Sequence, residues 1–267
     1  MCKFEKRKLL WALVALLLFS FPSLLFAHHA MEYIEMESYN LARKGDFVLH
    51  IHYDYFVEDR DDPGSDHYEF TPGLSYGVTD YLMFDVHTHL SKFGIEHIVP
   101  QRRALYEPGG PSPFFEAAAF SLQAKIPSFF PVDVGLALSY EVPFRRSVDL
   151  LDGKKVFEGT LILSRDLGEH RNLCANLKFG KDGDETVKEW ALGAKTPLTE
   201  DPHGIAAGIE VFGPFEKEEG VDYAKRLFIL VGSYFPLGSQ NVQMKTGLGF
   251  NLGFERLRVN ATLLYLF

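Results

Sequence analysis

Histidine and acidic residues alternate with apolar residues in three short stretches near the start of the chain. Of the ten histidines in the sequence, eight lie between residues 28 and 97. Imidazole and carboxylate groups together suit a divalent transition metal such as Zn, Cu, Ni or Fe. Imidazole also changes its charge near neutral pH, which would suit a pH-dependent electrostatic constriction. The candidate site residues share one parity within their stretches: His50, His52, Asp54, His67, Glu69, Asp85, His87 and His89.

The same residues also have a purely structural interpretation. Histidine is an ordinary residue in a polar barrel lumen, and charged ladders between strands stabilise a barrel wall. The sequence therefore predicts no resident cofactor, with a divalent metal at this cluster as the alternative. The pair His28-His29 would resemble a copper-binding amino terminus if a leader were removed after Ala27.

Strict alternation over eleven or more residues is a β-strand signal and not a helical one. In the stretch 46–58 the odd positions from Phe47 to Val57 are apolar, and the even positions carry His50, His52 and Asp54. We expect the apolar parity to face outward and the polar parity to face a lumen. The candidate histidines and carboxylates would then line one patch of inner wall.

The turns predict how the first three strands pair. If Gly77 lies opposite Tyr81, then Thr71 faces His87 on the next strand. The corresponding estimate for the first hairpin places Asp54 opposite Thr71. Neighbouring strands are about 4.8 Å apart, so imidazole and carboxylate groups on one face can converge.

Twelve segments of this kind follow one another along the chain, and none of the segments after residue 27 has 18 consecutive apolar residues. Strands of about 9–11 residues can cross a bilayer at a tilt. Short junctions alternate with several long ones, as expected of membrane barrels with short periplasmic turns. We therefore predict an all-β fold, a single antiparallel transmembrane β-barrel of about twelve strands with both termini periplasmic. The expected strands are 46–58, 67–78, 81–91, 114–126, 132–144, 156–165, 171–180, 187–196, 204–213, 226–235, 241–252 and 256–267.

The last expected strand, 256–267, ends on an apolar parity that includes Leu263, Tyr265 and Phe267. A barrel must close by pairing its last strand with its first, so 256–267 should pair with 46–58. The terminal pattern also resembles the insertion signal of bacterial outer-membrane barrels. That resemblance implies the barrel-assembly machinery and outer-membrane lipid as partners.

The start of the chain predicts export. Basic residues precede a nearly apolar run from Leu9 to Phe21, which indicates a secretory signal peptide over 1–27, cleaved on the way to the bacterial outer membrane. Removing 1–27 leaves 23 Lys+Arg and 35 Asp+Glu, a net charge of −12, which argues against a nucleic-acid partner. The segment 28–45 should be an N-terminal periplasmic segment, a short helix or irregular tail below the barrel of 46–267.

The stretch 69–80 resembles a segment of a Gram-negative outer-membrane family. The similarity rests on the pairs Pro72-Gly73, Tyr76-Gly77 and Thr79-Asp80. The family is catalogued as "MetA-pathway of phenol degradation" or transporter proteins. The resemblance implies a small-solute channel and supplies no functional residues.

These observations together predict a porin-like channel for passive passage of small solutes through a polar, acidic and His-lined lumen. The alternative is a metal- or ligand-binding outer-membrane barrel with little conductance. The long loop 92–113 could narrow the lumen through Arg102 and Arg103, or it could be purely extracellular. Ser121, Ser139 and Ser164 have no histidine at a spacing typical of a catalytic base, and the outward parity of the strands carries no histidine. We therefore expect no enzymatic activity and no catalytic residues.

Overall fold

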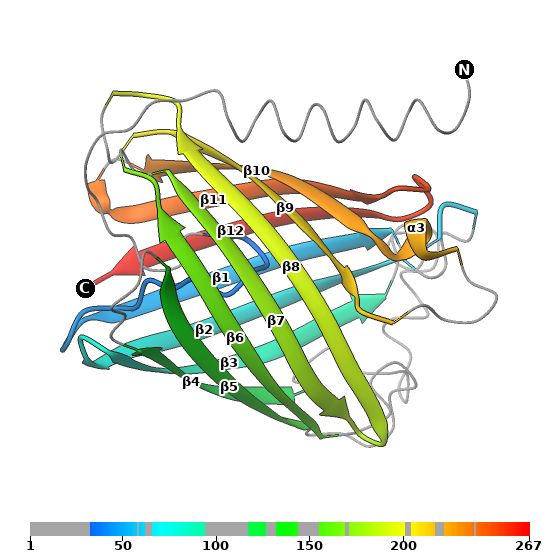
Figure 1. Ribbon diagram of the computed structural model, residues 1–267, viewed down its shortest axis with the longest axis horizontal. Coiled ribbons are helices and arrows are strands. Elements are labelled where there is room, and N and C mark those ends of the chain that lie inside the picture. Colours follow the sequence, from blue (N-terminus) through cyan, green and yellow to red (C-terminus); the bar gives the residue numbers. More distant parts are fainter. Residues whose placement is uncertain are drawn as a thin grey trace, which may run out of the picture.

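The computed structural model describes residues 33–57, 59–61, 66–93, 117–126, 132–143, 155–168, 171–200, 204–216, 222–237 and 239–267. These residues form one closed barrel of tilted antiparallel strands, in which each strand pairs with its neighbours in the chain (Figure 1). The predicted loop residues Arg102 and Arg103 and the pair His28-His29 lie outside the described residues. Within the described residues, no helix is long and apolar enough to span a membrane.

Twelve strands make up the barrel in the described part of the chain, and each of them overlaps one of the expected segments. One short helix, α3 (Tyr223–Arg226), precedes β10. The strands are β1 (Phe47–Val57), β2 (His67–Thr79), β3 (Leu82–Phe93), β4 (Ala117–Ile126), β5 (Asp133–Pro143), β6 (Val156–Asp166), β7 (Asn172–Asp182), β8 (Glu185–Pro197), β9 (Ala206–Pro214), β10 (Phe228–Leu237), β11 (Ser239–Asn251) and β12 (Leu257–Leu266).

The barrel closes between β1 and β12, as predicted. Val48 pairs with Leu266 at one end of this ladder, and Val57 pairs with Leu257 at the other. Beyond the last strand residue, the backbones of Phe47 and Phe267 exchange two hydrogen bonds of 2.9 and 3.0 Å. The two rings stack with centroids 5.7 Å apart. Closure leaves neither of these strands with an unpaired edge.

Alternation sets which side chains face outward. Leu49 is 39% exposed on the outer wall, whereas the next residue, His50, is 2% exposed and lies inside. The uniformly apolar stretch of β10 follows the same alternation, because Leu230 is fully buried and Val231 is 50% exposed. The outer wall is therefore an apolar surface, and the polar parity lines the interior.

The predicted register of the first two hairpins is wrong by two residues in each case. His87 lies opposite Gly73 and not opposite Thr71, because the turn falls one residue later and the ladder is irregular between Gly77 and Thr79. In the first hairpin Asp54 pairs with Glu69. A shift of two residues preserves the parity, so each side chain keeps its face of the sheet.

Residues 33–45, which we call the lumenal segment, lie inside the barrel. We expected a tail below the barrel, but the segment contacts the inner wall of strands on several sides. Tyr33 and Met36 pack with Ile162 and Cys174, and Ile34 packs with Leu230 and other residues. The segment has no helix or strand of its own. This position is possible because the inner wall offers polar groups to its backbone.

Candidate functional site

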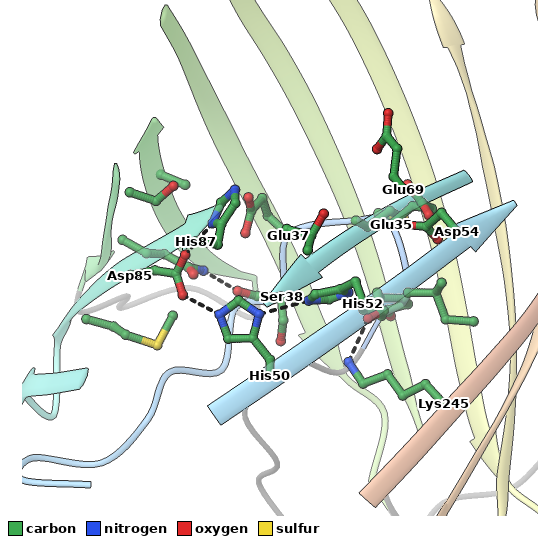
Figure 2. Close-up of a pocket in the computed structure, with 18 of the residues that line it drawn as sticks. Glu35, Glu37, Ser38, His50, His52, Asp54, Glu69, Asp85, His87 and Lys245 are labelled. Carbon is green, nitrogen blue, oxygen red and sulfur yellow. Dashed lines mark hydrogen bonds and ion pairs between the residues drawn. The ribbon is translucent and has the colours of Figure 1, made fainter. Parts of the chain in front are cut away.

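A cavity of about 250 Å³ lies between the lumenal segment and the inner wall (Figure 2). Seven of the eight candidate residues line it: His50, His52, Asp54, Glu69, Asp85, His87 and His89. The side chain of the eighth, His67, lies outside the described part of the structure. The sequence therefore places most of its candidate residues around one space, although the pairs in contact differ from those expected.

Asp85 on β3 is the centre of a hydrogen-bonded network with His50, His87 and Ser75. Its Oδ2 accepts from Ser75 Oγ at 2.7 Å and lies 2.6 Å from His50 Nε2. Its Oδ1 lies 2.7 Å from His87 Nδ1. His52 Nε2 continues the chain to His50 Nδ1 at 3.0 Å. We call His50, His52, Asp85 and His87 the histidine–aspartate network (Figure 2).

One assignment of protons satisfies every bond of this network with neutral rings. His50 donates from Nε2 to Asp85, so its Nδ1 accepts from His52 Nε2. His52 Nδ1 then accepts from the hydroxyl of Thr262 at 3.0 Å.

A second group of polar side chains lies at the β12 side of the cavity. Arg258 Nη1 pairs with Glu35 at 2.8 Å, and its Nη2 lies 3.8 Å from Asp54. The Asn260 amide donates to both of these carboxylates. Two carboxylates are thus held together by one guanidinium and one amide, an arrangement that joins β1 and β12 to the lumenal segment.

The network residues bind one another and do not converge on a common point. Among the described residues, no group of three or more His, Cys, Asp or Glu side chains is arranged to hold a metal ion. Asp85 accepts three hydrogen bonds, and two of them come from the histidines that would have been its fellow ligands. The geometry therefore gives no support to the predicted divalent metal.

The network also differs from a hydrolytic triad. Ser75 donates to Asp85 at 2.7 Å, so its hydroxyl is bound to the acid and not to the base. In a triad the nucleophile must be hydrogen bonded to the histidine. The thiol of Cys174 is buried and contacts the Glu37 carbonyl oxygen at 3.7 Å and Asn176 Oδ1 at 3.4 Å. Neither contact activates a nucleophile.

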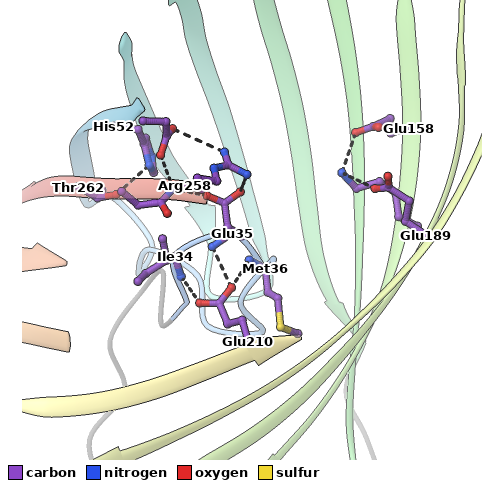
Figure 3. A network of polar contacts seen from close by, with 12 residues as sticks. Ile34, Glu35, Met36, His52, Glu158, Glu189, Glu210, Arg258 and Thr262 are labelled. Carbon is purple, nitrogen blue, oxygen red and sulfur yellow. Dashed lines mark hydrogen bonds and ion pairs between the residues drawn. The ribbon is translucent and has the colours of Figure 1, made fainter. Parts of the chain in front are cut away.

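Glu210 on β9 holds the start of the lumenal segment (Figure 3). Its carboxylate is fully buried and accepts three backbone N–H groups, from Ile34 at 2.7 Å and from Glu35 and Met36 at 3.0 Å each. Sequence reasoning missed this residue. The available signal was an isolated carboxylate among apolar and small residues at an inward position of the strand 204–213.

Other inner-wall side chains bind three backbone carbonyls of the lumenal segment. Lys245 Nζ donates to the Tyr33 carbonyl at 2.7 Å. Asn176 donates to the Glu37 carbonyl at 3.2 Å, and Gln123 donates to the Ser38 carbonyl. A buried backbone without secondary structure requires such partners. The wall is thus complementary to this stretch of chain in both hydrogen bonding and packing.

Glu37 projects from the lumenal segment into the cavity, where solvent reaches its side chain. Desolvation by the surrounding wall raises the pKa of its carboxyl group above the ordinary value. Nearby Lys178 and His87 oppose this rise, while Asp85 and Glu158 add to it.

Comparison with solved structures places the fold among porins. A KdgM porin matches at TM-score 0.51 and 8% identity, covering 82% of this chain and 98% of that chain. A NanC porin matches at TM-score 0.51 and 10% identity, covering 81% and 98%. A KdgM porin in complex with disordered oligogalacturonate matches at TM-score 0.52 and 9% identity, covering 82% and 98%. At these identities the likeness shows the fold alone.

The other comparisons do not assign the chain to a family. Outer membrane phospholipase A from Escherichia coli matches at TM-score 0.44, which is too low to carry an argument. No protein-family model matches the sequence, and no curated protein resembles it in sequence. The resemblance to the phenol-degradation family is therefore not confirmed. The closed twelve-strand barrel of the described residues is therefore a fold that these porins share.

Proposed function

We propose that the protein is an outer-membrane channel for passive passage of small solutes. The observation that carries this proposal is the two-sided wall: exposed apolar residues cover the outside, while ionisable residues surround a cavity on the inside. A lipid-facing wall around a polar interior is the arrangement of a membrane barrel. The porin fold of the solved relatives and the predicted signal peptide support the same location.

The charge of the cavity favours cations. Five carboxylate residues line it, from Glu35, Glu37, Asp54, Glu69 and Asp85, against the two basic residues Lys245 and Arg258. Arg258 is paired with Glu35, and Lys245 donates to a backbone carbonyl. A lumen with excess negative charge raises the local concentration of cations. The proposed channel therefore passes small cationic and neutral solutes more readily than anions.

Ion selectivity in planar bilayers tests this proposal. We expect single-channel currents from the refolded protein and a reversal potential that favours K⁺ over Cl⁻ across a salt gradient. The preference should fall in Glu37→Gln and in Glu69→Gln, because both changes remove negative charge from the cavity. Glu255→Gln is the matched control, since Glu255 pairs with Lys225 in an exposed position away from the cavity. Anion preference in the parent protein would contradict the proposal.

One observation favours a second candidate function, a ligand-binding barrel with little conductance. The lumenal segment occupies part of the interior and leaves a cavity of about 250 Å³ beside it. A barrel that stayed filled in this way would bind small molecules without passing them. Absence of single-channel current from correctly folded protein, with or without the segment, would favour this alternative.

A further inference from the structure

We propose that the lumenal segment is a releasable plug, docked in the barrel by Glu210 and by recesses at inward-facing glycines. This inference rests on the proposed channel function for its consequence, because release of the plug would widen the conducting path. The docking itself is argued from contacts alone. The segment begins at Tyr33, crosses the lumen and joins β1 through the exposed residues 43–45.

Two inner-wall glycines face one side chain of the segment. A Cβ atom at Gly232 would lie 2.3 Å from Ile34 Cδ1, and a Cβ at Gly247 would lie 2.8 Å from the same atom. Both distances are too short for real carbon atoms, so Ile34 adopts this side-chain conformation only because these positions lack side chains. Gly193 leaves space for Tyr33 in the same way, because a Cβ atom at Gly193 would lie 2.5 Å from Tyr33 Cε1. The wall is shaped around this particular segment.

The bonds that hold the segment are replaceable by water. Glu210, Lys245 and Asn176 bind its backbone through side chains, and residues 33–42 take no part in strand pairing with the barrel. When the segment leaves, water entering the lumen can hydrate these same groups. A buried carboxylate without a cationic partner would be costly in a dry core but not in a wet channel. The polar side chains of the wall can therefore be hydrogen bonded in both the docked and the released state.

The connection to β1 can act as the hinge. Gly45 has a φ of +89°, a conformation that glycine adopts without strain. The N–H of Gly45 donates to the Gly77 carbonyl of β2 at 2.8 Å, which marks the point about which the segment would turn. Residues 43–45 are exposed, in contrast to the buried Tyr33, Ile34 and Met36. A change of backbone angle beside Gly45 would swing the segment, and it would break the contacts of residues 42–44 with the β2–β3 hairpin.

The thiol of Cys174 can report whether the lumenal segment is docked. Cys174 is 4% exposed and packs beneath Tyr33 and Met36 on the inner wall. In a Cys2→Ser background it is the only thiol in the sequence. A membrane-impermeant maleimide should label it slowly in the parent protein. Release of the segment should expose it to the lumen.

The test compares two glycine substitutions on the inner wall. Gly232→Ala places a methyl group against Ile34, whereas Gly249→Ala has its nearest neighbours at 3.5 Å or beyond and serves as the control. Overpacking one docked contact should speed Cys174 labelling about tenfold or more in Gly232→Ala, and should raise the conductance. Ile34→Ala removes the side chain that makes this contact from the segment, so it should also speed Cys174 labelling and raise the conductance.

The outcomes separate the two proposals. Labelling in Gly232→Ala and Ile34→Ala at the parent rate, with the barrel still heat-modifiable on gels, would overturn the releasable plug. Labelling that appears only when heat-modifiability is lost would also overturn it, because the segment would then leave only when the barrel unfolds. Faster labelling in a folded barrel without any conductance would support the plug and contradict the channel function.

Discussion

His50 Nε2 lies 2.6 Å from Asp85 Oδ2, although the strands that carry them, β1 and β3, are not neighbours. β2 lies between them, and its residue opposite both His50 and His87 is Gly73. A Cβ atom at Gly73 would lie 2.2 Å from His50 Cε1 and 2.6 Å from His87 Cβ. The imidazole of His50 therefore crosses β2 through the space that the missing side chain leaves.

The first prediction is that Gly73→Ala breaks the histidine–aspartate network. The new methyl group must displace His50, which leaves Asp85 without one of its three donors. Loss of a buried hydrogen-bond partner costs about 1–3 kcal/mol, so the midpoint of urea unfolding should fall. Gly159→Ala is the control, because its nearest neighbour would lie at an ordinary 3.4 Å. Equal midpoints in the two variants would show that His50 reaches Asp85 by another route.

The sequence predicted the strands and their facing because both follow from a period of two. It could not predict the register of the first hairpins, since a turn centred one residue earlier or later moves every pair by two. Parity survives that error, so Asp85 and His87 still lie inside. Their contact partners, however, depended on Gly73, whose role appears only once three strands are placed together.

The lumenal segment could not be predicted for a different reason. It has no periodicity, and its backbone is held by side chains far away in the sequence, such as Glu210 and Lys245. Each of these looks like an ordinary inward residue of its own strand. Only an unusual feature, a single carboxylate in the apolar strand β9, pointed toward a buried partner.

The outward facing of Leu49 on β1 predicts that a charged residue at this position destabilises the folded barrel. Leu49 is exposed on the outer wall near the end of the barrel where β1 begins, so Leu49→Arg places a charge against lipid close to the interface and should cost up to about 1 kcal/mol. Leu49→Ala controls for the lost side chain. Folding efficiency into lipid vesicles, followed by heat-modifiable gel mobility, measures the difference. Equal yields for the Arg and Ala variants would contradict the proposed contact of this face with lipid.

Replacement of Glu210 should weaken the docking of the lumenal segment. Glu210→Ala leaves three backbone N–H groups without their acceptor, so we expect the segment to undock and Cys174 labelling to accelerate. Glu210→Gln keeps one acceptor oxygen and should give an intermediate rate. Losing a charged acceptor of this kind costs about 1.5–3 kcal/mol per strong bond. Labelling of both variants at the parent rate would show that the apolar contacts alone dock the segment.

The last prediction concerns pH and rests on Glu37. Docking raises the pKa of its carboxyl group above the ordinary 4.5, because the wall desolvates the charged form. The group therefore stabilises the docked state fully below the undocked pKa, and this contribution is lost as the pH rises through the docked pKa. Release of the segment should accordingly increase with pH above about 4.5.

The measurement must separate docking from the chemistry of the reporter thiol, which itself becomes more reactive as pH rises. Dividing the Cys174 labelling rate of the parent by that of Gly232→Ala at each pH removes the intrinsic change. The ratio should rise with pH in the parent, and Glu37→Gln should flatten it. The groups around Glu37 are Lys178 on β7, Asp85 and His87 on β3, and Glu158 on β6. A ratio with the same slope in the parent and in Glu37→Gln would assign the pH dependence to one of these neighbours and not to the segment.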